Sequence, residues 1–298
     1  MIVREPGREE AGALAELLNS YSRPLYGEAD LSADTVDHWF DIRGIWFRVA
    51  ERDGVLVGYL DLTREDGGKR FEIDARATDD DAVAALIAAA ESHAREHGVP
   101  GAMLRGHTAW ADEGSRAVYE RAGYEFVRHF FDMRTELRDT APPEWPEGVS
   151  VRTFRDEDED AVWECFNETF ADHWDHRPAT EERRADWRHN TRGSPWFEHD
   201  LWFLAEDGGT LAGISLCSWS HSGDRTFGWV QILGVRRPWR RRGLALALLR
   251  HSFAEFERRG ATRVGLGVDA TNPTGAVGLY ERAGMRVQRR SVAWEKTL

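Results

Sequence analysis

One short pattern occurs twice in this chain, and it constrains the fold more than any other feature. Residues 118–123 and residues 279–284 both read aliphatic-Tyr-Glu-Arg-Ala-Gly, which places Tyr119 and Tyr280 161 positions apart. A strand, a glycine turn and a second strand are also predicted at equal spacing around Gly58 and around Gly213. Repetition on this scale indicates two copies of one structural arrangement.

The repeat therefore predicts two domains, and a length of 298 residues agrees with that number. The one proline-rich break, residues 139–149, lies between the two copies and is predicted to be a linker. We expect a first domain over residues 1–138 and a second over residues 150–298.

The second half contains a strand pattern, a basic turn and a helix pattern in direct succession. The apolar run 229–234 predicts the strand, and residues 246–259 predict a helix from apolar side chains at helical spacing. The turn between them contains Arg240, Arg241, Arg242 and Gly243. A helix start has unpaired N–H groups and partial positive charge, so this turn predicts an anion site suited to a pyrophosphate. The alternatives are a solvated basic face and a nucleic-acid patch.

The spacing Arg240-x-x-Gly243-x-Ala245 after a strand resembles the acetyl-CoA loop of the GNAT acyltransferase superfamily. A second block, with Asn272 followed by Leu279-Tyr280-Glu281, resembles the fifth-strand and fourth-helix signature of that family. The resemblance is sharp over residues 229–285. With the repeat, it implies a tandem GNAT protein of the α/β class. Each domain is then expected to have a mixed, mostly antiparallel central sheet flanked by helices.

The resemblance also implies a reaction, in which acetyl-CoA donates an acetyl group directly to a primary amine of a small molecule. It assigns two catalytic roles: a backbone N–H at or near Val235 stabilises the oxyanion, and Tyr280 protonates the leaving thiolate. The residues it assigns to acetyl-CoA binding are Leu233, Val235, Arg240, Arg241, Arg242, Gly243, Leu244, Ala245, Asn272 and Tyr280. An ordinary buried tyrosine is the alternative for Tyr280, and a helix cap is the alternative for Asn272.

The first half differs at the position of the cofactor loop. The 161-residue offset aligns the three arginines with Asp79, Asp80 and Asp81, and it aligns Gly243 with Ala82. Carboxylates suit a helix start but repel a pyrophosphate. We therefore predict a degenerate first domain and one acetyl-CoA site, in the second domain.

The general base stays open at this point. An alkylammonium must lose a proton before it attacks, and many GNAT enzymes are expected to use a glutamate on the fourth strand. Residues 227–235 contain no carboxylate. The candidates elsewhere are Glu168, Asp172, His221 and Asp269. An acceptor amine with a low pKa would need little help.

Aromatic residues crowd the segment that would cover the acceptor groove. Eight lie within 40 residues: Trp163, Phe166, Phe170, Trp174, Trp187, Trp196, Phe197 and Trp202. Most are expected in the core, and some are candidates to line a pocket for a bulky acceptor. His173 and His176, next to Asp172 and Asp175, have a spacing that a metal site could use, but a solvated loop is the favoured interpretation and no metal is expected.

Charge and composition limit the partners. The formal net charge is −13, which argues against nucleic acid because phosphate contacts need clustered positive charge. No apolar run approaches 18 residues, so no membrane span is expected. The N-terminus has no signal-peptide core, and two cysteines make no disulfide framework. A cytoplasmic monomer or homodimer is the expectation.

Three alternatives to a general small-molecule N-acetyltransferase stay open. Two are tandem enzymes, of the mycothiol synthase type or of a type that modifies amine-bearing antibiotics. The third belongs to a different class, a non-catalytic acyl-CoA-binding or sensory protein, and the missing strand carboxylate leaves room for it. The retained Tyr280 and Arg240–Ala245 loop favour an enzyme.

Overall fold

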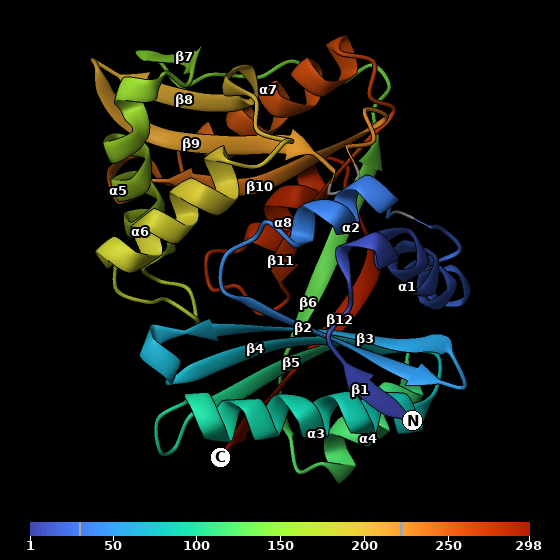
Figure 1. Cartoon of the computed structure of the whole chain (residues 1–298). Helices are drawn as coiled ribbons and strands as arrows, with labels where there is room; N and C mark the ends of the chain where they lie inside the picture. Colours follow the sequence, from blue (N-terminus) through green and yellow to red (C-terminus); the bar gives the residue numbers. More distant parts are fainter. Residues whose placement is uncertain (30, 221–222) are drawn as a thin grey trace. The chain divides into compact units, whose positions relative to one another are not determined.

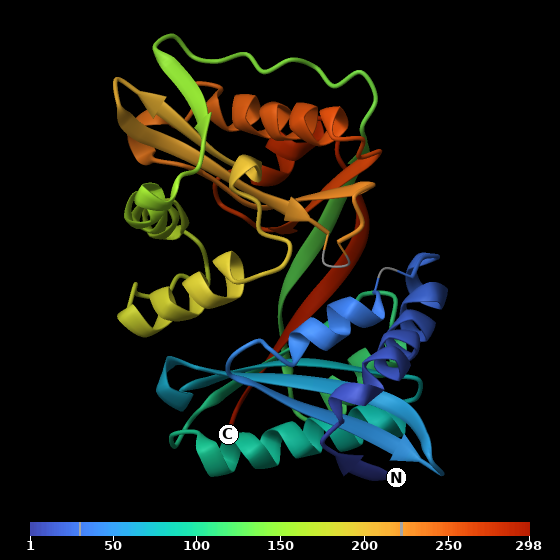
Figure 2. The same cartoon turned by 45° about the horizontal axis from the view of Figure 1, so that its top comes forward.

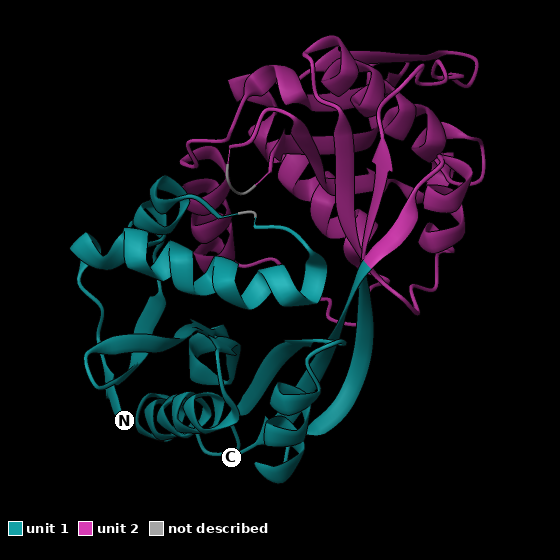
Figure 3. Cartoon of the chain, turned by 90° about the vertical axis from the view of Figure 1, so that its right-hand side faces the viewer, with its two compact units in different colours: residues 1–131, 289–298 teal, residues 132–288 magenta. Residues whose placement is uncertain are grey.

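A computed structural model describes residues 1–29, 31–220 and 223–298. The chain forms two compact units, coloured separately in Figure 3. Unit 1 contains Met1–Phe131 and Arg289–Leu298, and unit 2 contains Asp132–Gln288. The predicted α/β class is confirmed, because each unit has a mixed, mostly antiparallel sheet with helices packed on it.

Unit 1 has a sheet in the order β1-β2-β3-β4-β5-β12, in which β4 and β5 are parallel and the neighbouring pairs are antiparallel. Helices α1 and α2 lie on one face of this sheet and α3 and α4 on the other (Figure 1). The elements are β1 (Ile2–Arg4), α1 (Ala11–Tyr26), α2 (Ala33–Trp39), β2 (Ile45–Arg52), β3 (Val55–Glu65), β4 (Arg70–Ala77), α3 (Asp80–His97), β5 (Met103–Ala109) and α4 (Glu113–Arg121).

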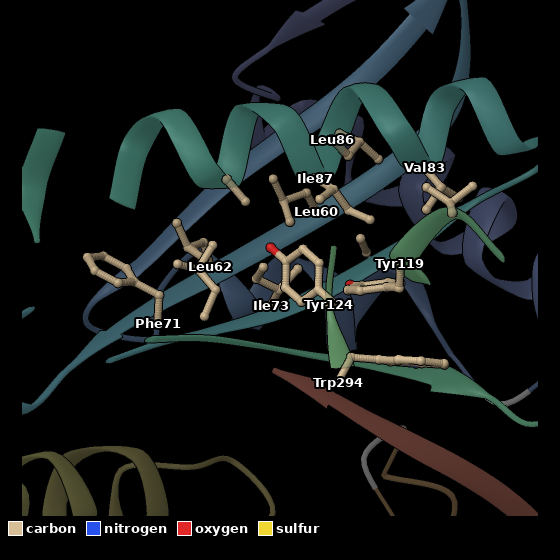
Figure 4. Close-up of a cluster of buried hydrophobic side chains, with 14 of the residues drawn as sticks. Leu60, Leu62, Phe71, Ile73, Val83, Leu86, Ile87, Tyr119, Tyr124 and Trp294 are labelled. Carbon is tan, nitrogen blue, oxygen red and sulfur yellow. The ribbon is translucent and has the colours of Figure 1, made fainter. Parts of the chain in front are cut away.

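The core of unit 1 lies between the sheet and α3. Alternate residues of β3 and β4 point toward the helix, as strand periodicity requires, and they meet the apolar stripe of α3. Figure 4 shows this cluster, with labels on Leu60, Leu62, Phe71, Ile73, Val83, Leu86, Ile87, Tyr119, Tyr124 and Trp294. Within the cluster, the Tyr119 ring packs on Tyr124 and on Trp294, with ring centroids 5.0 and 6.1 Å away.

Unit 2 repeats the arrangement with strand order β7-β8-β9-β10-β11-β6. Helices α5 and α6 lie on one face of its sheet and α7 on the other (Figure 2). Its elements are β7 (Val149–Thr153), α5 (Glu159–Phe170), α6 (Glu181–Trp187), β8 (Trp202–Asp207), β9 (Thr210–Trp219), β10 (Phe227–Val235), α7 (Leu244–Arg258), β11 (Arg263–Asp269) and α8 (Ala276–Arg282). The strands β6 (Glu125–Glu136) and β12 (Arg286–Thr297) each have residues in both units.

The last strand of the chain belongs mainly to unit 1. Residues 291–297 of β12 pair antiparallel with residues 103–109 of β5, although the sequence had placed all of 150–298 in the second domain. The strand β6, which follows α4 in unit 1, lies beside β11 in the sheet order. The sheet of unit 1 therefore ends with β12, from the end of the chain, and the sheet of unit 2 ends with β6, which precedes the linker. A local sequence pattern does not specify either neighbour.

No helix in the described ranges has both the length and the apolar composition needed to cross a membrane.

Candidate functional site

The parallel strands β10 and β11 separate soon after they meet. They pair only where Phe227, Gly228 and Trp229 face Arg263, Val264 and Gly265. The remainder of β10 stays paired with β9 on its other edge, with a bulge between Val230 and Ile232. The edge of β10 that faces β11 therefore has no ladder partner among the described residues from residue 230 to residue 235.

Backbone direction shows which groups face this open edge. Arg236 donates its N–H to the Ala212 carbonyl on the β9 side, at 2.9 Å. Successive residues of a strand direct their N–H and C=O groups to opposite edges. The N–H groups of Val235 and Leu233 therefore point into the split between β10 and β11. The Val235 carbonyl, on the same edge, accepts a hydrogen bond from Arg240 Nε at 3.0 Å.

The helix α7 begins directly after the turn that follows β10. Its N-cap is Gly243, with φ of 87°, a left-handed conformation that glycine adopts without strain. No side chain caps this helix, and a Cβ built on Gly243 would meet no atom within 4 Å. Among the described residues, no side chain therefore pairs with the first N–H groups of α7, and the space at Gly243 is open, as an anion site at a helix start requires.

The helix α8 starts in the same way and positions Tyr280. Gly275, with φ of 76°, is its N-cap, and Asn272 Oδ1 accepts hydrogen bonds from the Thr274 N–H at 2.9 Å and the Thr274 hydroxyl at 2.5 Å. Tyr280 is only 8% exposed, and burial raises its pKa to about 12. Its hydroxyl has no hydrogen bond to any residue that the structure describes, so a protonated donor is available there at neutral pH.

Comparison with known proteins decides the family of a chain with this geometry. The model of the acetyltransferase (GNAT) family matches twice, over residues 13–124 and 134–285. The chain belongs to this acetyltransferase family. Its tandem arrangement, predicted from the repeat, is confirmed by the two matches, and membership makes it an N-acetyltransferase-type enzyme.

Individual relatives share most of the length. A mycothiol acetyltransferase from Geodermatophilus obscurus is 33% identical over 293 residues, covering 92% of this chain and 88% of that protein. One from Streptomyces bingchenggensis is 32% identical, with coverage of 78% and 79%. A solved GCN5-related N-acetyltransferase from Sphaerobacter thermophilus has a TM-score of 0.82 and 30% identity, covering 99% of this chain and 95% of the other.

A second solved structure shares the fold alone. A tandem GNAT protein from the clavulanic acid biosynthesis pathway has a TM-score of 0.78 at 19% identity, covering 99% of this chain and 98% of the other. Two GNAT units in one chain are thus a known architecture at this length.

The three arginines of this GNAT loop have different partners. Arg240 hydrogen-bonds Asp172 at 2.8 Å and the Thr169 carbonyl at 3.3 Å, besides the Val235 carbonyl. It therefore ties the end of α5 to the end of β10, a role the sequence did not predict. Arg242 lies 3.8 Å from Asp207, and Arg241 has no partner in the described part of the chain. These two exposed guanidiniums remain available to an anion.

Helix α5 approaches β10 closely at the same place. A Cβ on Gly234 would lie 2.5 Å from the Thr169 hydroxyl oxygen, so only glycine allows this contact. The carboxylates at the end of α5 form ion pairs with arginines. Glu168 pairs with Arg236 at 3.0 Å. Hydrogen bonds from Arg240 and from Arg237 lower the pKa of Asp172 to about 2.

The lowered pKa makes Asp172 a poor proton acceptor, and the ion pair of Glu168 with Arg236 directs that carboxylate to an arginine. A third base candidate, Asp269, accepts the N–H and the hydroxyl of Thr271 at 2.8 and 2.9 Å in a turn. The fourth, His221, lies outside the described residues. The sequence favours a solvated loop around His173, but this side chain is half-buried. No cluster of three or more metal-ligating side chains occurs among the described residues.

The aromatic residues divide into core and edge. Trp163 and Trp202 are buried, and Trp187 and Phe197 pack against the core that contains Trp202. A row of rings then runs along α5. Trp163 is 5.9 Å from Phe166, Phe166 is 5.0 Å from Phe170, and Phe170 is 4.2 Å from His173, between ring centroids. The half-buried end of this row lies beside the Arg240 loop.

Unit 1 differs from unit 2 at the equivalent positions. Its parallel strands β4 and β5 stay paired over five residues, from Arg70 to Asp74, and no bulge interrupts the pairing of β4 with β3. Asp79 caps α3 with its own side chain, at 3.0 Å from the Ala82 N–H, and Arg52 holds that carboxylate with two hydrogen bonds. Tyr119 is fully buried.

Proposed function

We propose that this chain is an acetyl-CoA-dependent N-acetyltransferase whose working site lies in unit 2 and whose acceptor is a primary amine of a small molecule. The observation that carries the proposal is the open edge of β10, which ends at an uncapped helix start with Gly243 in open space. The N–H groups on the open edge of β10 would bind the thioester end of acetyl-CoA, and the anion site at the start of α7 would bind its pyrophosphate. A short loop connects the two.

The residues of unit 2 fit acetyl-CoA in their chemistry. The first N–H groups of α7, from Leu244 and Ala245 onward, would hold the pyrophosphate, with Arg241 and Arg242 adding positive charge. The backbone of Leu233 and Val235 would bind the pantetheine arm as an added strand binds a sheet edge. Asn272 has its oxygen in the turn before α8, which leaves its NH₂ group as a donor to the ligand.

Two groups of the chain would serve the chemical step. The Val235 N–H would donate to the oxygen of the tetrahedral intermediate, where negative charge develops. Tyr280, kept protonated by its raised pKa, would donate a proton to the departing sulfur. Both groups are supplied by one unit, so the reaction needs no catalytic residue from unit 1.

A more specific acceptor has support from the relatives. The mycothiol acetyltransferase of Geodermatophilus obscurus matches nearly the whole chain at 33% identity. We therefore include the acceptor of the mycothiol acetyltransferases as the first amine to test. Because β10 contains no carboxylate, an enzyme that acts on this acceptor would need its base from another element of the chain.

The test is thiol release from acetyl-CoA by the full chain with a panel of amines. The panel contains the acceptor of the mycothiol acetyltransferases, amino sugars, polyamines and amine-bearing antibiotics. We expect at least one amine to raise release well above the rate without amine, and mass spectrometry to find its N-acetyl product. Tight acetyl-CoA binding with no amine-dependent release across the panel would contradict an enzyme and support a binding protein.

A further inference from the structure

We infer that His173 is the base that removes a proton from the acceptor ammonium at the mouth of the β10–β11 split. This inference rests on the proposed function, and it names the catalytic residue that the strand β10 does not supply. Three observations support it: the position of the loop after α5, the ion pairs of the neighbouring carboxylates, and the lack of a hydrogen bond from the His173 ring to the described residues.

The position of His173 is fixed by bonds on both sides. Its N–H donates to the Phe170 carbonyl at 2.9 Å, and its carbonyl accepts from the His176 N–H at 3.0 Å. The preceding residue, Asp172, is held by Arg240, which also bonds Val235 at the end of β10. The loop that carries His173 is therefore joined directly to the strand end where the open edge lies.

The His173 ring is half-buried against Phe170, with 4.2 Å between ring centroids. Neither ring nitrogen has a hydrogen bond to any residue in the described ranges. A half-buried imidazole without a protein partner can accept a proton from a ligand. In contrast, Asp172 and Glu168 on the same segment are occupied by Arg240, Arg237 and Arg236.

Four titratable or charged side chains act on the pKa of His173. Asp172 and His176 belong to its own loop, Arg240 to the turn after β10, and Asp269 to the end of β11. Burial is the largest effect and lowers the pKa of His173 below 6.5, with smaller contributions of the same sign from Arg240 and His176. The two carboxylates act in the opposite direction. The ring is therefore neutral at pH 7 and able to act as a base.

The proton balance of the step is simple. His173 takes one proton from the ammonium, and the freed nitrogen lone pair forms the C–N bond with the thioester carbon. The C–S bond breaks, its electron pair leaves with sulfur, and sulfur takes a proton from Tyr280. The second proton lost by the new amide nitrogen restores Tyr280 through solvent, and His173 releases its proton to solvent.

The experiment compares His173→Gln with His176→Gln in the full chain, using the best amine of the panel. His176 lies three residues away, is exposed, and serves as the matched control. In the wild type, kcat/KM should rise with pH through a pKa below 6.5. His173→Gln should lose this limb and about 10²–10⁴-fold in kcat, the usual contribution of a general base. His176→Gln should behave as wild type.

Two further readouts separate catalysis from structure. The loss in His173→Gln should shrink for acceptor amines of low pKa, and added imidazole should restore part of the activity of His173→Ala. Acetyl-CoA affinity and thermal stability should stay unchanged in both variants. A retained acid limb with a rate near wild type would overturn the inference, as would a loss of rate that follows a loss of acetyl-CoA binding.

A failure of this inference can be distinguished from a failure of the proposed function. If wild-type protein turns over an amine and His173→Gln does so equally well, only the assignment of the base fails. If wild-type protein turns over no amine, the proposed function fails and this inference fails with it.

Discussion

The two units have the same order of elements but differ in what occupies the end of their parallel strand pair. In unit 1, a Cβ built on Gly106 would lie 2.2 Å from the Tyr119 ring, so the tyrosine packs directly on β5. The equivalent position in unit 2 is Gly267, where a Cβ would meet no atom within 4 Å. A tyrosine at the same place in the repeat thus closes one unit and leaves the other open.

The hydroxyl groups of the two tyrosines show the same contrast. The Tyr119 oxygen is enclosed and has no hydrogen-bond partner in the described structure, and its ring packs on Tyr124 and Trp294. Tyr280 is not among the enclosed, unpartnered groups. Unit 1 therefore keeps the fold of the family while using its tyrosine as core. The comparison shows that the two units share their packing and differ in the separation of their parallel strands and in the capping of the helix that follows.

The largest expected difference between the units is in the roles of their tyrosines. Tyr280→Phe should lower turnover by about 10²–10⁴-fold, because a general acid contributes in that range, with acetyl-CoA affinity nearly unchanged. Tyr119→Phe should leave turnover unchanged, since it removes only an unpaired buried hydroxyl. Steady-state kinetics and calorimetry of both variants check this. Equal turnover in the two variants would remove the catalytic role from Tyr280.

The second difference concerns the helix starts. Gly243→Asp places a carboxylate at the start of α7 and should weaken acetyl-CoA binding tenfold or more, about 1.4 kcal/mol. Gly243→Asn has the same shape and the same tolerance of positive φ, so it separates charge from backbone strain. In unit 1, Asp81→Asn should leave the affinity unchanged. Equal binding by Gly243→Asp and Gly243→Asn would show that no phosphate lies there.

The third difference is one of packing. Gly106→Ala should destabilise the protein by about 1–3 kcal/mol, the usual cost of overpacking, because its Cβ would overlap the Tyr119 ring. Gly267→Ala has open space and should change the melting temperature little. Thermal unfolding of both variants measures the contrast. A similar fall in melting temperature for both would mean that the end of β11 is as closely packed as the end of β5.

The smallest expected effects are on the pH dependence of stability. A buried aspartate in unit 1 and an ion-paired aspartate in unit 2 should change the melting temperature in opposite directions when each is replaced by asparagine. In unit 1, burial and then the charge of Asp74 raise the pKa of Asp61 to about 7, against about 4 in an unfolded chain. The folded state then binds more protons between pH 4 and 7, so stability falls as pH rises through this range. Asp61→Asn should therefore raise the melting temperature at pH 8 and change it little at pH 4.

Asp172 in unit 2 should do the opposite. Hydrogen bonds from Arg240 and then Arg237 lower its pKa to about 2, so its contribution is present above pH 4 and is lost as pH falls toward 2. Asp172→Asn should slightly lower the melting temperature at pH 7. Melting curves at pH 4, 7 and 8 test both variants. Shifts of the same sign at neutral pH would contradict the charge assignments.

Much of this architecture follows from local sequence. The repeat predicted two α/β units, and apolar side chains at helical spacing predicted the helix α7. The cap alternative for Asn272 was wrong, because α8 begins after Gly275 and Asn272 instead accepts hydrogen bonds from Thr274 in the preceding turn. The pairing of the final strand was not predictable, because nothing in residues 291–297 specifies that residues 103–109 are their partner. Strand pairing is a long-range choice, and its energy comes from packing that a local pattern does not contain.

The site residues show the same limit at the level of side chains. The sequence assigned Arg240 to an anion, whereas its guanidinium turns back to Val235, Thr169 and Asp172. It placed His173 in a solvated loop, because a polar stretch between helices has no periodicity that reveals burial. Direction and enclosure depend on neighbours distant in sequence. The assignments of Gly243, Val235 and Tyr280 remain predictions that the variants above test.

The most direct test of the central claim is the number of acetyl-CoA molecules bound per chain. The whole chain must be used, because β12 completes unit 1 and a fragment ending at the linker would lack it. Isothermal titration calorimetry should show one acetyl-CoA per wild-type chain and a tenfold or greater loss of affinity in Gly243→Asp, about 1.4 kcal/mol. Two equivalents bound per chain, or one equivalent that is insensitive to Gly243→Asp, would contradict the account.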